Sequence, residues 1–153
     1  MLNSIDGPTH EYMKSSPACF AMFGDILAAE YSDPTLLDTH RITVDTYAVQ
    51  HPGESASRRE IQSVGLHLAR LMLQLESTIP PKETNDVMLR LGPHKQTLNY
   101  LESPTQFTMT IANVHPFIGT NRHSSMVRNW ALATWNDWHL HHEYIKNWTD
   151  NLR

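Results

Sequence analysis

The segment from Ser57 to Pro80 has every sequence feature of an amphipathic helix, namely a capped start, a periodic apolar face and a defined end. Ser57 and Glu60 form a capping box, the pairing that satisfies unpaired N–H groups where a helix begins. Pro80 and Pro81 end the pattern, because proline has no N–H and clashes with the preceding turn. Such an amphipathic helix needs other elements to cover its apolar face. That face comprises Ile61, Val64, Leu68, Leu71 and Leu75.

Two helices are predicted before this segment. Ser16 and Pro17 resemble an N-cap and a first helical residue, and the pattern that follows stops at Asp33. A second helix is predicted to begin with Asp33 as its N-cap and to end against 52–53, a Pro-Gly pair. The alternative for this second segment is a strand over 41–49, where β-branched residues are frequent. Length and capping favour the helix. Its stripe comprises Leu37, His40, Val44, Tyr47 and His51.

The C-terminal half is less regular. A short helix is predicted over 84–91, and one long helix from about Ser124 to Leu152 contains all four tryptophans. Between 93 and 122 the pattern is weak. Residues 107–111 alternate like a strand, whereas Thr110 before 111–114 equally suggests a capped helical turn, and the sequence leaves both open.

These elements predict an all-α fold, a single-domain antiparallel bundle of four to five helices with an irregular segment around 93–122. The 153 residues have the length of one domain. We expect 1–15 to be an irregular lead-in, because it mixes turn-forming residues without periodicity, and 16–153 to form the helical domain.

Composition excludes several classes of function. The net charge of −4, with no cluster of Lys or Arg, argues against nucleic acid as a partner. No apolar run reaches membrane-spanning length, and the N-terminus lacks the pattern of a signal peptide, so no membrane association is expected. The single cysteine, Cys19, cannot form an intramolecular disulfide. Together these features favour a cytoplasmic protein.

Ten histidines are the strongest functional signal, because imidazole is a common metal ligand. His40 and His51 lie eleven residues apart, about 16 Å along a straight helix, so they cannot share one metal. His141 and His142 diverge by about 100° around a helix. His67 is expected to be half-buried. For any single histidine, hydrogen bonding in the core is the more frequent role.

Other residues carry weaker signals. Asp45 lies off the histidine stripe, which predicts either a solvated carboxylate or a group that supports a ligand. Gln50 and His51 immediately precede a Pro-Gly turn, where a polar pair can point into a cleft. The sequence has no nucleophile elbow, glycine-rich phosphate loop or pair of cysteines at zinc-ribbon spacing.

Four stretches resemble an uncharacterised bacterial protein family, domain of unknown function 5946. They are ACFAMFGDILAAEYSDP, HRITVDTYAVQHPG, SVGLHLARL and VRNWALATWNDWHLHHEYIKNW, and together they cover most of the chain. The resemblance implies no reaction. Many members begin with a CPxCG-like pair of cysteines, whereas this chain has only Cys19. The positions that match the family are His40, Asp45, Tyr47, Gln50, His51, His67, His141 and His142.

Two hypotheses follow. In the first, the protein binds a ligand or partner through a site between helices rich in His and Trp, with Gln50, His40, Trp135 and Trp138 as binding residues. The ligand, a small molecule or a protein, is unidentified, and a homodimer through the tryptophan helix is compatible with the pattern. In the second, a metal-dependent hydrolase or transferase holds a divalent transition metal, zinc by preference, with Asp45 and Tyr47 as catalytic residues. Its ligands are His51, His67 and one of His141 and His142.

Overall fold

The computed structural model describes residues 16–53, 56–77 and 79–153, and within these ranges every regular element is helical. The predicted all-α fold is therefore confirmed, and the alternative of a strand over 41–49 is wrong. The expected irregular lead-in at 1–15 lies outside the described residues. None of the described helices combines the length and apolarity needed to cross a membrane.

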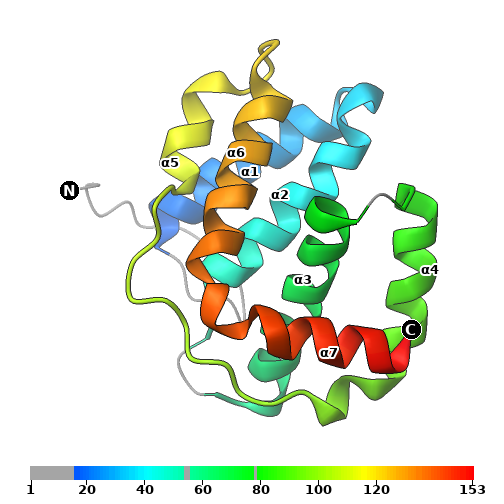
Figure 1. Ribbon diagram of the computed structural model, residues 1–153. Coiled ribbons are helices and arrows are strands. Elements are labelled where there is room, and N and C mark those ends of the chain that lie inside the picture. The colour runs from blue at the N-terminus through cyan, green and yellow to red at the C-terminus, as the bar shows by residue number, and fades with distance from the viewer. Residues whose placement is uncertain (1–15, 54–55, 78) are drawn as a thin grey trace.

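Seven α-helices lie in the described part of the chain, more than the four to five predicted (Figure 1). Short 3-10 turns at Pro34–Leu36, Gly92–Thr97, His115–Phe117 and His139–His141 adjoin them. The α-helices are α1 (Pro17–Tyr31), α2 (Leu37–Gln50), α3 (Arg58–Glu76), α4 (Pro81–Leu91), α5 (Ile111–Val114), α6 (His123–Asp137) and α7 (His142–Leu152).

The predicted helix starts are largely confirmed by their caps. The Ser16 hydroxyl accepts a hydrogen bond from the Cys19 N–H at 3.1 Å, and Pro17 begins α1. The Asp33 carboxylate accepts from the Thr35 N–H at 3.0 Å, at the start of the 3-10 turn that leads into α2. The capping box at the start of α3 is present in full. These caps satisfy N–H groups that a helix start leaves unpaired.

Two elements differ from the prediction. First, α4 begins at Pro81 rather than at 84, because proline is well suited to a first helical position. Second, the predicted long last helix is broken: α6 ends at Asp137 and α7 begins at His142. Of the two alternatives left open before residue 115, the capped helical turn is the one present, as α5, where the Thr110 N–H donates to Asn113 Oδ1 at 2.9 Å.

The break follows from hydrogen bonds at Trp138. Its backbone N–H is shared between the carbonyls of Thr134 and Trp135, so the last turn of α6 tightens toward 3-10 geometry. After the break, α7 runs across the lower end of α3 in Figure 1 instead of continuing along α6. The side chains of α7 thereby reach the same core as those of α6.

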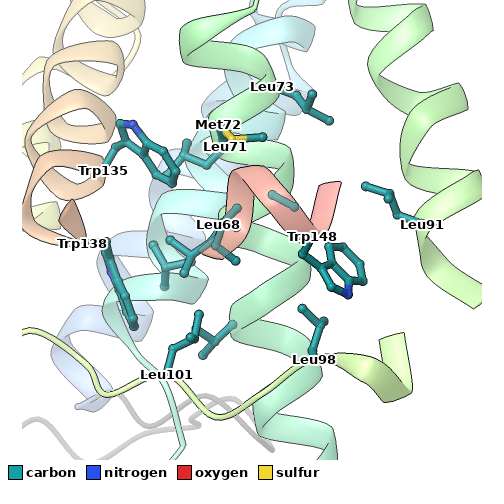
Figure 2. Packing of buried hydrophobic residues seen from close by; sticks show 14 of the residues in the cluster. Leu68, Leu71, Met72, Leu73, Leu91, Leu98, Leu101, Trp135, Trp138 and Trp148 are labelled. Atoms are coloured by element: carbon teal, nitrogen blue, oxygen red, sulfur yellow. The ribbon is translucent and has the colours of Figure 1, made fainter. Parts of the chain in front are cut away.

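The main core surrounds α3. Leu68 and Leu71 of α3 are fully buried, with Trp135, Trp138 and Trp148 of the C-terminal helices in the same cluster (Figure 2). A second cluster lies between α1, α2, α5 and α6 and includes Tyr47 and Trp130. The two cores flank α2 and α6, so polar side chains on these helices have to find partners inside the protein.

Candidate functional site

The buried carboxylate of Asp45 is the centre of a polar contact between α2 and α3. Asp45 Oδ1 accepts from His67 Nδ1 at 2.7 Å and pairs with Arg70 Nη2 at 2.7 Å. Arg70 Nε lies 2.9 Å from both carboxylate oxygens, and Gln74 Nε2 donates to Oδ2 at 2.6 Å. A buried carboxylate requires such donors, because leaving it unpaired would cost several kcal/mol. The prediction of a solvated Asp45 is therefore wrong, whereas a role in supporting a ligand stays a prediction.

The same contact fixes the orientation of His67. A carboxylate paired with arginine only accepts hydrogen bonds, so His67 Nδ1 carries a proton, and in the neutral ring the lone pair is on Nε2. The His67 side chain is 25% exposed, and Nε2 bonds to none of the described residues. An imidazole held in this way can accept a proton or coordinate a cation. The same geometry is equally compatible with a His67 side chain that only holds α2 and α3 together.

A second buried carboxylate, Glu30 of α1, lies between two histidines. Thr43 Oγ1 donates to Glu30 Oε2 at 2.6 Å, and His123 Nε2 donates to the same oxygen at 2.9 Å. His40 Nδ1 lies 3.2 Å from Oε1. Because the Gly119 N–H donates to His123 Nδ1, it is Nε2 of His123 that donates to Glu30. His40 is thus part of a contact that joins α1, α2 and α6.

Sequence reasoning singled out His40 in this cluster and missed Glu30, Thr43 and His123. One signal was available for Glu30. It follows Phe23 and Ile26 on the apolar stripe of α1, and an acid on such a stripe predicts a buried carboxylate with partners.

The three site residues predicted at the end of α2 pack against neighbouring helices or form hydrogen bonds inside the protein. Tyr47 is fully buried, with its ring stacked on Phe23 at 3.9 Å between centroids. The Gln50 amide donates to the Met109 carbonyl at 2.7 Å and to Thr134 Oγ1 at 2.8 Å, which fixes the segment before α5 against α2 and α6. His51 Nδ1 donates to the Tyr47 carbonyl at 2.9 Å. Burial lowers the pKa of His51, because desolvation disfavours the charged ring.

At the corner between α6 and α7, His142 packs against Trp135. The two rings stack at 3.8 Å with 10° between their planes, and His142 Nε2 donates to the Trp135 carbonyl at 2.6 Å. Trp135 Nε1 donates to Glu76 Oε1 at 2.8 Å. Both predicted residues thus hold the corner in place and link it to α3.

A groove of about 510 Å³ lies beside this corner, between residues 102–106 and 136–141; we call it the corner groove. Trp138, His139 and His141 are part of its lining. His141 Nε2 donates to the Glu102 carbonyl at 2.9 Å, across the two sides of the groove. Trp138 is 1% exposed, and its indole N–H meets no acceptor in the described part of the chain. Two residues named from the sequence, Trp138 and His141, therefore meet here.

The four predicted metal ligands do not converge. His51 donates to the Tyr47 carbonyl, and His67 donates to Asp45. His141 donates to the Glu102 carbonyl, and His142 donates to the Trp135 carbonyl. Among residues 16–53, 56–77 and 79–153, no three side chains of His, Cys, Asp or Glu form a group that could hold a metal ion. The divalent-metal site stays a prediction that these contacts do not support.

Comparison with known proteins identifies the family. A model of a family of unknown function, DUF5946, matches residues 6–139, and the chain belongs to that family. A search of curated proteins finds no similar sequence, and a search of solved structures finds no similar structure.

Proposed function

We propose that this member of the DUF5946 family is a binding protein that takes up a small organic molecule in the corner groove. The observation that carries the proposal is the groove itself. Its volume of about 510 Å³ falls within the range of about 300–1,000 Å³ that is typical of ligand sites.

The lining indicates the kind of molecule. Ser103, Gln106 and Asn136 offer hydroxyl and amide groups, whereas Pro104 and Leu140 offer apolar surface. Leu140 is 81% exposed, so nearly all of its apolar side chain is open to contact with a molecule in the groove. This combination suits a compact molecule with an apolar ring and one or two neutral hydrogen-bonding groups.

Hydrogen bonds within the chain join the two sides of the groove. His141 bonds the Glu102 carbonyl, and the Asp137 carboxylate accepts from the N–H and the hydroxyl of Thr108 at 2.8 and 2.7 Å. A ligand therefore does not have to order these segments, which lowers the entropic cost of binding.

The test is an NMR titration of the ¹⁵N-labelled chain with phenol, benzamide and cyclohexanol, each of which joins an apolar ring to one polar group. We expect saturable shifts of the Trp138 indole N–H, with smaller shifts of Trp130. Leu140→Ala should weaken binding about threefold or more, because it removes buried apolar contact. Ser103→Trp should abolish binding by filling the groove.

Leu89→Ala is the matched control, since Leu89 is 76% exposed on α4 and does not line the groove. It should leave the affinities unchanged. Absence of saturable shifts with all three probes, or equal loss of affinity in both leucine variants, contradicts the proposal.

A further inference from the structure

We propose that a second hollow, separate from the corner groove, binds a small oxyanion such as a phosphate or carboxylate group. It has a volume of about 220 Å³ and lies where α2 and α4 begin and α3 ends. In Figure 1 these helix ends lie in the right half of the view, above α7. We call it the arginine hollow; its lining includes Asp38, Arg41, Gln74, Pro81, Thr84 and Arg128.

Two guanidinium groups from different helices supply the charge. Arg41 comes from α2 and Arg128 from α6, and neither pairs with an acidic side chain in the described part of the chain. Arg41 has only a long hydrogen bond, 3.4 Å from its Nη1 to the Pro81 carbonyl. Guanidinium groups that lack a carboxylate partner are the usual protein donors to phosphate and carboxylate oxygens.

The nearby Asp45 does not neutralise these arginines. Its carboxylate is already paired with Arg70 and also accepts from Gln74, and Asp45 itself is not part of the lining of the hollow. Asp38 is the one carboxylate in the lining, so the side chains there carry a net charge of about +1. The hollow thus favours a small anion, and Asp38 opposes one of high charge.

The helix geometry adds to this charge. Asp38 and Arg41 lie in the first turns of α2, and Pro81 and Thr84 lie in the first turn of α4. Helix beginnings carry partial positive charge. The arginines are the main contribution, because Pro81 has no N–H to offer.

The experiment is calorimetric titration of the full chain with sodium phosphate, and separately with sodium acetate, at low ionic strength. We expect one saturable site for at least one of these anions, weakened by added NaCl because the hollow is open to solvent. Arg41→Gln and Arg128→Gln should each raise Kd about fivefold, the loss expected for one partly exposed charged contact. Which anion binds more tightly separates a phosphate site from a carboxylate site.

Two further variants make the test specific. Asp38→Asn should lower Kd severalfold, because it removes the opposing charge without removing a donor. Arg90→Gln, on the exposed face of α4 and outside the lining, removes the same net charge from the chain and should leave Kd unchanged. The proposal is overturned if neither anion binds saturably, or if Arg90→Gln weakens binding as much as Arg128→Gln does. The arginine hollow and the corner groove share no lining residue, so either site can fail without the other.

Discussion

His67 Nδ1 and Asp45 Oδ1 lie 2.7 Å apart, and Arg70 Nη2 contacts the same oxygen at 2.7 Å. Two side chains nearly one turn apart on α3 therefore meet one carboxylate on α2. This arrangement fixes how the two helices are positioned along each other, and it directs His67 Nε2 away from the carboxylate.

Asp45→Asn is expected to destabilise the protein strongly. The amide keeps the shape of the side chain but leaves the partly buried Arg70 without a counter-charge, which costs about 3–5 kcal/mol. His67→Gln should cost less, about 1–3 kcal/mol, because it removes one hydrogen bond to a carboxylate that keeps its other donors. Urea unfolding followed by circular dichroism measures both. A loss below about 1 kcal/mol for Asp45→Asn would show that this contact does not hold α2 to α3.

The predicted metal site can be tested with variants of His67 and His51. Since His51 and His67 bond different partners, we expect untagged protein to retain only a small fraction of an equivalent of zinc. His67→Ala should lower the melting temperature without changing the metal content, and so should His51→Ala. The measurement is the metal content of the unmodified protein and of the two variants by elemental mass spectrometry. One equivalent of metal that is lost in both variants would establish the three-histidine site.

Local patterns predicted most of the helices correctly. Caps such as Ser16 and Ser57 act within three or four residues, so their effect is visible in the sequence. The corner after α6 was missed for the opposite reason. No Pro or Gly lies between His123 and Leu152, and the apolar spacing continues from Trp135 through Ile145, because α6 and α7 cover the same core.

The candidate sites are formed by contacts between residues that lie far apart in the sequence. Asp45 and His67 were both named from the sequence, but their contact joins residues 22 apart on two helices, and helix periodicity does not give the rotation of one helix against another. Trp138 and His141 were named as well. Their groove depends on residues 102–106, where the sequence shows no periodicity.

His51 should make stability depend on pH. Burial lowers the pKa of His51 in the folded protein, so the unfolded chain binds the proton more readily. The stability is therefore fully present above the unfolded pKa of about 6.5 and declines as the pH falls through the lower, folded pKa. His51→Gln should make the free energy of unfolding less dependent on pH in this window. Urea unfolding at a series of pH values from 7.5 downward measures the slope, and an unchanged slope in the variant contradicts the assignment.

Glu30→Gln tests the second buried carboxylate. The amide can keep its oxygen toward Thr43 and His123, which both donate to Oε2 of Glu30, but it then places an N–H₂ group toward His40, which faces Oε1. The neutral amide is a weaker acceptor for Thr43 and His123 than the carboxylate and disturbs the contact with His40, at a combined cost of about 1–3 kcal/mol. Thr43→Val is the milder comparison, expected to cost about 1 kcal/mol, because it removes one donor and leaves the carboxylate with two others. Thermal unfolding ranks the two variants, and the reverse order would contradict the central role of Glu30.

Two glycines in helices should respond in opposite directions to alanine. A Cβ at Gly65 of α3 would lie 2.7 and 2.8 Å from the two methyl carbons of Leu98, which is itself buried. The resulting overpacking costs about 1–3 kcal/mol, more than the gain of about 1 kcal/mol in helix propensity. At Gly24 of α1 a Cβ meets nothing within 4 Å, so Gly24→Ala should stabilise the protein by up to about 1 kcal/mol.

Combining Gly65→Ala with Leu98→Ala gives the decisive comparison. If the clash is the cause, the added methyl group becomes neutral or stabilising once Leu98 is shortened, and strictly additive effects in urea unfolding would contradict the close contact between α3 and Leu98.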